Sequence, residues 1–121
     1  MADEKIQLCA LTEMAANPAK GFAIKTGASD QYIFVVQHND RLYGYINRCP
    51  HTGVNLDWLP DQFLDDTGKL IVCATHGAQF RIEDGYCIHG PCSGKSLTSV
   101  AISIDDSRVF LHLGRQYPSS R

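Results

Sequence analysis

Two short segments of the chain each combine a cysteine with a histidine, and this repetition restricts how the chain can fold. The first segment contains Cys49 and His51 with a proline between them. The second contains Cys73 and His76 with two residues between them. Thiolates and imidazoles are good ligands for transition metals, and each pair is close enough in sequence for both side chains to reach one centre. The pattern therefore favours a fold in which two separate loops converge on a metal.

Most of the remaining sequence has the pattern of short β-strands. Runs of this kind occupy residues 21–26, 31–38, 41–47, 69–73, 78–82, 86–90, 97–104 and 108–113. The pairs Asn39-Asp40 and Asp84-Gly85, and residues 105–107, separate consecutive runs and favour tight turns. Only residues 11–16 favour a short helical turn. The pattern predicts an all-β domain with antiparallel pairing, of the sandwich or barrel kind.

Length and charge limit the classes of function. The chain has 121 residues, which suits one domain, and its formal net charge is −2. No basic run indicates a partnership with nucleic acid or with a membrane surface. The N-terminal segment carries acidic residues and has no unbroken apolar core, so we expect neither a secretory signal nor a membrane anchor. The expected location is cytoplasmic, where the five cysteines act as ligands or thiols rather than disulfides.

The cysteine and histidine motifs resemble those of the Rieske iron–sulfur family. The matching stretches are CPH at 49–51 and CATHG at 73–77. The stretch FRIEDGYCIHGPC at 80–92 is similar to the family's hairpin and to the proline-bearing loop that covers its cluster. The resemblance extends loosely over the flanking strands, so it covers most of the chain.

The resemblance implies a fold, a cofactor and a ligand set. One [2Fe–2S] cluster would be held with Cys49 and Cys73 on the inner iron and His51 and His76 on the outer iron. The implied fold is an antiparallel Rieske-like arrangement of small stacked sheets, with a cluster-binding subdomain formed by two loops. That subdomain would occupy roughly residues 47–92 of a single Rieske domain spanning 1–121. Each loop would then serve both irons.

Two other interpretations of the four residues remain open. A structural zinc site also uses two cysteines and two histidines. Zinc fingers usually keep like ligands together, whereas each pair here is mixed, and this favours the iron–sulfur cluster. The four residues could also be ordinary packed or surface side chains, although four of them in two loop pairs make that interpretation the weaker one.

The segment between His51 and Cys73 is longer than the usual family spacing. The additional residues fall within 57–69, and we expect a surface loop there. An alternative is that Trp58, Leu59 and Phe63 form a patch that contacts a partner.

Rieske proteins of respiratory complexes resemble the chain in their ligands but differ at four nearby positions. Val54 and Thr75 stand where those proteins have two cysteines that form a disulfide. Ala78 and Phe80 stand where they have a serine and a tyrosine whose hydroxyls donate hydrogen bonds to sulfur. Such donors stabilise the reduced cluster, so we expect a low potential within the Rieske range of about −150 to +300 mV. These differences are typical of the soluble Rieske-type ferredoxins.

The other cysteines need separate interpretations. Cys9 is predicted to be a small apolar strand residue. Cys87 and Cys92 flank a short turn and could lie close together, but a reducing cytosol disfavours a disulfide. His89 could influence the cluster, and Pro91 is expected to shield it.

The function that the resemblance implies is one-electron transfer rather than catalysis. The chain has no dinucleotide-binding glycine motif, and no second set of two histidines and a carboxylate for a mononuclear iron. The implied partners are an NAD(P)H-dependent flavin reductase as donor and a terminal oxygenase as acceptor. One alternative is a small Rieske subunit of a larger oxidoreductase such as a nitrite reductase. Another is a zinc-stabilised binding module.

Metal analysis separates the cluster from the zinc site. We predict that protein purified without oxygen contains two irons and two acid-labile sulfides per chain, with little zinc. The measurement is elemental analysis combined with a sulfide assay. A zinc ion in place of iron, in a colourless protein, would contradict the Rieske interpretation.

Overall fold

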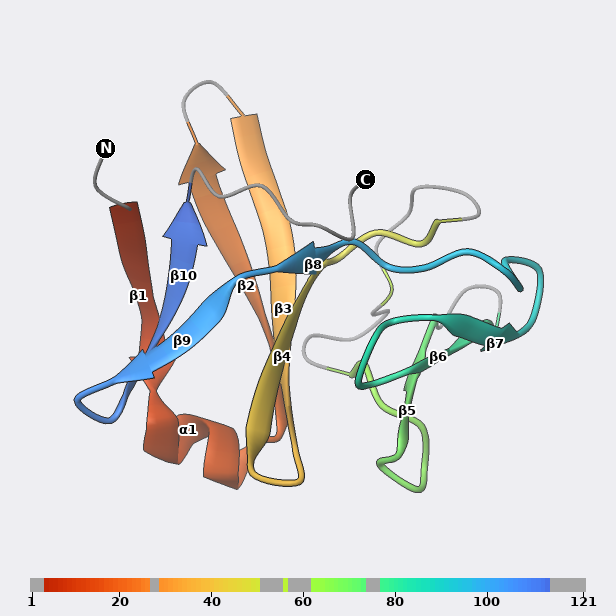
Figure 1. The fold of residues 1–121 in the computed structure, drawn as a ribbon, viewed down its shortest axis with the longest axis horizontal. Helices are drawn as coiled ribbons and strands as arrows, with labels where there is room; N and C mark the ends of the chain where they lie inside the picture. The colour runs from red at the N-terminus through yellow and green to blue at the C-terminus, as the bar shows by residue number, and fades with distance from the viewer. Residues whose placement is uncertain (1–3, 27–28, 51–55, 57–61, 74–76, 114–121) are drawn as a thin grey trace.

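Antiparallel strands make up most of the regular structure (Figure 1). The computed structural model describes residues 4–26, 29–50, 56, 62–73 and 77–113. The elements in chain order are β1 (Glu4–Ala10), α1 (Leu11–Ala16), β2 (Ala19–Thr26), β3 (Ser29–His38), β4 (Arg41–Ile46), β5 (Leu70–Val72), β6 (Gln79–Arg81), β7 (Cys87–His89), β8 (Ser99–Val100), β9 (Ile102–Asp105) and β10 (Arg108–Leu113). The predicted all-β class is confirmed, and so is the helical turn at 11–16.

The strands form three small sheets. Their orders are β1-β10-β9, β2-β3-β4-β8 and β5-β6-β7. Every recorded strand pairing is antiparallel. Figure 1 shows the β5–β7 sheet and the β1–β10 pair at opposite ends of the long axis, with β3 and β4 between them. In the part of the chain that the structure describes, no helix is long and apolar enough to span a membrane.

Two of the hairpin turns have the backbone that their sequences predict. Asn39 and Asp40 join β3 to β4 with φ angles of 52° and 65°. Asp106 and Ser107 join β9 to β10 with φ angles of 53° and 60°. Two consecutive residues with positive φ form the type I′ turn, whose twist matches that of the flanking strands. Asp84-Gly85 also lies between two paired strands, but within a longer connection from 82 to 86.

The sequence pattern was wrong about two strands. It placed Cys9 in a strand but gave no strand run over β1, in which Ile6 and Leu8 alternate with polar residues and which pairs with β10. It also predicted one strand over 97–104, whereas the chain forms β8 and β9 there. β8 pairs with β4 and β9 pairs with β10, so the chain changes sheets at Ala101. The Ala101 carbonyl accepts a hydrogen bond from His112 N at 3.0 Å, which fixes this crossover.

Strand β3 is buried on both faces and separates two hydrophobic cores. Val35 faces the smaller core, which also contains Cys9, Met14 and Val109. Phe34 and Val36 face the larger core on the opposite side, because side chains alternate along a strand. The larger core consists of Ala19, Phe34, Val36, Tyr45, Cys49, Leu56, Phe63, Ile71, Cys73, Ala78, Phe80, Ile82, Cys87, Cys92 and Leu97. It therefore joins the central sheet to the β5–β7 sheet, and the predicted packing of Cys9 in a strand is confirmed.

Specific contacts bridge the central sheet and the β5–β7 region. The ring of Phe63 stacks on that of Phe34, with centroids 4.3 Å apart and an interplanar angle of 8°. The Tyr45 hydroxyl donates to the Ile82 carbonyl at 2.6 Å. Phe63 has no exposed surface, so the proposed partner-facing patch is wrong for this residue. Trp58 and Leu59 lie outside the described residues.

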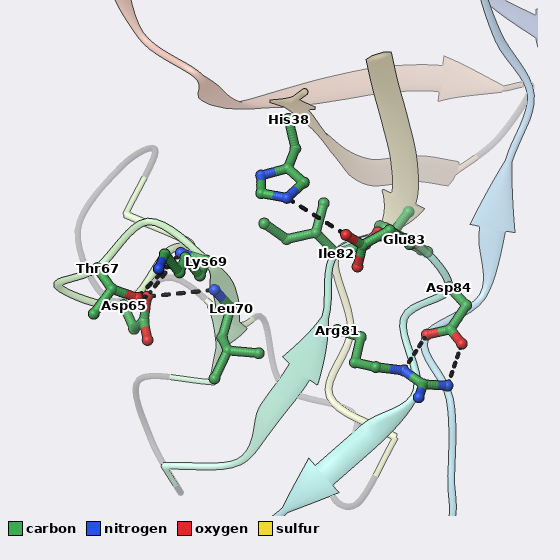
Figure 2. Close-up of polar contacts among 10 residues, drawn as sticks. His38, Asp65, Thr67, Lys69, Leu70, Arg81, Ile82, Glu83 and Asp84 are labelled. Carbon is green, nitrogen blue, oxygen red and sulfur yellow. Dashed lines mark hydrogen bonds and ion pairs between the residues drawn. The ribbon is translucent and has the colours of Figure 1, made fainter. Parts of the chain in front are cut away.

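Polar contacts at the edge of this region fix two turns (Figure 2). The Asp65 carboxylate accepts from the Thr67 hydroxyl at 2.8 Å and from the backbone N–H groups of Lys69 and Leu70. These bonds outweigh the effect of desolvation, so the pKa of Asp65 is lowered. Figure 2 also shows Arg81 paired with Asp84 in the turn after β6.

Figure 2 shows one further bridge, between His38 at the end of β3 and Glu83 in the turn after β6. The His38 Nε2 atom lies 3.4 Å from a Glu83 carboxylate oxygen. Glu83 is more than half exposed, so solvent screens this pair and its contribution to stability is small. The buried Tyr45 contact is the stronger link between the two regions.

Substitution of Tyr45 tests this link. We predict that Tyr45→Phe lowers the free energy of unfolding by about 1–3 kcal/mol, because the buried Ile82 carbonyl loses its donor. Burial raises the pKa of the Tyr45 hydroxyl, so the folded protein keeps the proton. Above about pH 10 the unfolded chain loses that proton, and the wild type should lose part of its advantage over the variant. Urea unfolding at neutral and alkaline pH measures both effects, and equal stabilities at neutral pH would contradict the role of this bond.

Candidate metal centre

Cys49 lies in a connection that begins where β4 ends. Asn47 is buried just before it, and its side-chain oxygen accepts from the Leu56 N–H at 2.7 Å. The Asn47 N–H in turn donates to the Tyr32 carbonyl at 2.8 Å. The first bond holds the two ends of the 47–56 segment close together, and the second ties Asn47 to β3. The segment between them carries the first cysteine and histidine pair.

Cys73 follows β5 directly and begins a closed turn. Its N–H donates to the Ala78 carbonyl at 2.9 Å, and its carbonyl accepts from the Gly77 N–H at 2.8 Å. Gly77 has a φ of 70°, a conformation that glycine adopts without the strain of a side chain. Two backbone hydrogen bonds thus close the segment from 73 to 78. In the sequence this segment contains the second cysteine and histidine pair, Cys73 and His76.

Both candidate cysteines are completely buried in the larger core. Cys49 and Cys73 each have no exposed surface, and both are thiols rather than disulfide partners. His51 and His76, the other two predicted ligands, lie outside the described residues. Within the described residues alone, no group of three or more histidine, cysteine or acidic side chains is placed to hold a metal. The two buried thiols are soft donors that fit the inner iron of an iron–sulfur cluster.

A third connection packs against the Cys73 turn. It runs from β7 through Gly90, Pro91 and Cys92. Gly90 has a φ of 106°, and a Cβ atom there would lie 2.7 Å from the Ala78 Cα atom. Only glycine permits this approach without displacing backbone. Cys92 is buried while Pro91 is exposed, so the shielding role expected of Pro91 stays a prediction.

The two cysteines of this connection lie close together, as predicted. The Cys87 and Cys92 sulfur atoms are 3.5 Å apart, well beyond the length of a disulfide bond, and both are thiols. Cys92 also lies in the larger core together with Cys49. The sequence interpretation considered Cys92 only as a disulfide partner and did not place it in one core with Cys49.

The two positions expected to lack donors are both buried in the same core as the cysteines. Ala78 and Phe80 belong to the larger core with Cys49 and Cys73, and neither side chain carries a hydroxyl. Val54 and Thr75 lie outside the described residues. The low potential inferred from Ala78 and Phe80 stays a prediction.

A family model decides the classification. The Rieske [2Fe-2S] domain model matches residues 4–106, which is most of the chain. The chain belongs to the Rieske [2Fe–2S] domain family. Its cofactor is one [2Fe–2S] cluster. Such a cluster takes up and releases single electrons, so membership of the family supports an electron-carrying protein.

Solved structures share the fold at low sequence identity. The ferredoxin of carbazole 1,9a-dioxygenase from Nocardioides aromaticivorans IC177 is 19% identical, with a TM-score of 0.67 over 88% of this chain and 95% of that chain. A complex of reduced oxygenase and oxidized ferredoxin in carbazole 1,9a-dioxygenase contains a match at 18% identity, with a TM-score of 0.70 over 93% of this chain and 96% of that chain.

The same fold also occurs within a longer protein. The terminal oxygenase of carbazole 1,9a-dioxygenase from Novosphingobium sp. KA1 is 20% identical, with a TM-score of 0.71 over 95% of this chain. The chain corresponds to 31% of the length of that oxygenase chain. None of the curated protein sequences matches the chain.

The close approach at Gly90 generates a prediction with an internal control. Gly90→Ala should destabilise the protein and speed loss of iron to a chelator, because the new methyl group displaces the Ala78 backbone. Gly94 also has a positive φ, of 90°, but a Cβ atom there meets nothing within 4 Å. Gly94→Ala therefore shares the backbone strain without the clash. Iron release and thermal unfolding measure the difference, and equal behaviour of the two variants would contradict the packing role of Gly90.

Proposed function

We propose that the protein carries one electron at a time from an NAD(P)H-dependent flavin reductase to a terminal oxygenase. The bound [2Fe–2S] cluster supplies the redox chemistry. Cys49 and Cys73 hold the inner iron in this proposal, and His51 and His76 hold the outer iron. The proposal treats residues 1–121 as a single Rieske domain that serves partner enzymes and has no catalytic role of its own.

The burial pattern around the two loops supports this division of ligands. Cys49 and Cys73 lie in the larger core with no exposed surface. Pro50, next to Cys49, is only partly buried, and Gly77, four residues after Cys73, is exposed. Each buried cysteine thus has a less buried residue near it in the chain. In this proposal His51 and His76 place their iron nearer to solvent than the cysteines do, where a partner's redox centre can approach.

The electron-transfer proposal rests on the Rieske family match, together with the burial of Cys49 and Cys73 in the larger core. The fold shared with a dioxygenase ferredoxin, and with a chain in an oxygenase–ferredoxin complex, supports an oxygenase as acceptor. Rieske ferredoxins of this kind accept electrons from flavin reductases, which the motif resemblance implies for the donor. Contacts with both partners should be small and transient.

A second candidate function rests on the match to the terminal oxygenase. There the same fold occupies about a third of a longer chain, so a Rieske domain also works as a fixed part of a larger oxidoreductase. In that case the protein would remain bound to its enzyme rather than exchange between two partners. Purification from the cells that make it distinguishes the two candidates by the size at which it elutes.

Stopped-flow mixing tests the proposed carrier directly. The cluster-loaded protein is first reduced by NADH or NADPH through a catalytic amount of a flavin-dependent ferredoxin reductase. It is then mixed with the oxidised oxygenase component of carbazole 1,9a-dioxygenase. We predict that the carrier is reoxidised as the oxygenase is reduced, one electron per chain. Weak binding should make the rate rise with oxygenase concentration.

Two serine variants provide the control. Cys73→Ser should lose the cluster and all transfer, because it removes a proposed ligand. Cys9→Ser changes another buried thiol, in the smaller core, and should keep both the cluster and the transfer rate. An intact cluster in Cys73→Ser would refute the ligand assignment. A loaded wild type that neither the reductase reduces nor the oxygenase reoxidises would refute the carrier proposal.

A further inference from the structure

A small groove lies where β4 ends beside β8, at the residues that flank Cys49. Its volume is about 160 Å³. The described residues that line it come from β3, from the end of β4 with the connection after it, and from the segment before β8: Gln31, Ile46, Arg48, Pro50, Ser96 and Thr98. We call it the Arg48 groove. Arg48, Ser96 and Thr98 are exposed, so the groove opens to solvent, and none of its lining residues is acidic.

Backbone hydrogen bonds fix the walls of the Arg48 groove. The Ile46 N–H donates to the Thr98 carbonyl at 2.8 Å, which joins the end of β4 to the segment before β8. The Asn47 N–H donates to the Tyr32 carbonyl at 2.8 Å, which joins the same part of the chain to β3. Leu97, just before Thr98, is buried in the larger core. The groove is therefore formed before a ligand arrives, and binding costs little free energy of reorganisation.

Arg48 gives the groove a positive charge. Within the described part of the chain no ion pair involves Arg48, whereas Arg81 and Arg108 each pair with an aspartate. Lys95, next to Ser96 in the chain, is exposed and also forms no ion pair there. The groove and its edge thus carry positive charge that is available to an anionic ligand.

The size and the donors of the groove select its ligand. Pockets that bind drug-sized molecules have volumes of about 300–1,000 Å³, so the Arg48 groove is too small for a flavin or a nicotinamide but large enough for one side chain. A guanidinium presents its N–H groups in a planar fork that matches a carboxylate. The Ser96 and Thr98 hydroxyls and the Gln31 amide are further hydrogen-bond donors. An aspartate or glutamate side chain fits both the size and the donors.

We propose that the Arg48 groove receives a carboxylate side chain of the redox partner and so holds that partner beside the cluster. The inference rests on the proposed function, because it takes Cys49 as a cluster ligand. Arg48 and Pro50 both line the groove and are the two chain neighbours of Cys49. A partner carboxylate bound there lies next to the segment that holds the inner iron. Its attraction to Arg48 therefore favours the encounters in which an electron can be transferred.

A small anionic oxidant tests the charge of the groove without a partner protein. Ferricyanide takes one electron from the reduced cluster and becomes ferrocyanide. We predict that Arg48→Gln slows this reaction about two- to fivefold at low ionic strength, because the oxidant is a multiply charged anion. Arg41→Gln removes another exposed arginine, at the opposite end of β4, and should change the rate little. Both variants lose the same charge, so equal rates would overturn the proposal.

Stopped-flow mixing with the oxidised oxygenase component of carbazole 1,9a-dioxygenase tests the docking role. The rate constant for reoxidation of the carrier is measured at increasing sodium chloride concentration. Arg48→Gln should lower the rate at low salt about three- to tenfold and flatten its dependence on salt, because an ion pair at an interface acts mainly on association. Arg41→Gln should follow the wild type. If the two variants show the same salt dependence, the groove does not dock the partner and the proposal fails.

A second pair of variants occupies the groove instead of removing its charge. Thr98→Glu places a carboxylate on the groove wall, where it can pair with Arg48 and imitate the partner. Thr98→Gln has nearly the same shape without the charge. The Thr98 side chain is exposed, and its bond with Ile46 uses the backbone carbonyl, so both variants should fold. Thr98→Glu should slow transfer to the oxygenase as much as Arg48→Gln does, whereas equal slowing by Thr98→Gln would overturn the proposal.

These outcomes are distinct from those that test the proposed function. Iron content and the visible spectrum should be the same in all variants, because none of the changed residues is a proposed ligand. If the wild type transfers no electrons to the oxygenase, the proposed function fails, and the ferricyanide rates decide whether the Arg48 groove attracts anions. If the wild type transfers electrons and Arg48→Gln behaves as Arg41→Gln does, only the groove proposal is wrong. Submillimolar binding of free glutarate would also overturn it, because the groove would then be a small-molecule site.

Discussion

The larger hydrophobic core is the constraint on which the candidate metal centre depends. Strand β3 is buried on both faces, and its Phe34 side supports Phe63 and the β5–β7 sheet. Without this shared core, the loops at Cys49 and Cys73 would have no common hydrophobic surface to pack against. Hydrophobic packing is non-directional, whereas the buried hydrogen bond from the Tyr45 hydroxyl to the Ile82 carbonyl requires one relative orientation of the two groups. The central sheet therefore positions the centre although few of its own residues belong to it.

Specific contacts fix each of the three connections around the centre. The Asn47 side chain joins the ends of the first, the Cys73–Ala78 bonds close the second, and Gly90 brings the third onto the second. Local closure lowers the entropy cost of bringing the loops together, because each loop has few conformations left to lose. A redox site gains from such rigidity, since little of the structure then has to rearrange when one electron arrives.

The sequence alone predicted the features that depend on local chemistry. The turn at Asn39-Asp40, the antiparallel pairing and the Rieske family follow from short patterns, and all are confirmed. Features that depend on tertiary packing were missed. Phe63 is apolar in a polar segment and was considered for a partner patch, but it is buried against Phe34 from a distant strand. The larger core brings Cys92 together with Cys49, which is far away in sequence, so no local pattern could reveal that they share it.

In the proposed centre two mixed loops share one cluster, with thiolates on one iron and imidazoles on the other. Electron–nuclear double resonance on the reduced protein, with ¹⁵N incorporated only in histidine, tests this arrangement. We predict two histidine nitrogens coupled to the cluster spin, and the loss of one coupling in each of His51→Cys and His76→Cys if the cluster still assembles. A reduced cluster with no coupled histidine nitrogen would contradict this arrangement, because the two ligands assigned to the outer iron would then have to be sought elsewhere in the chain.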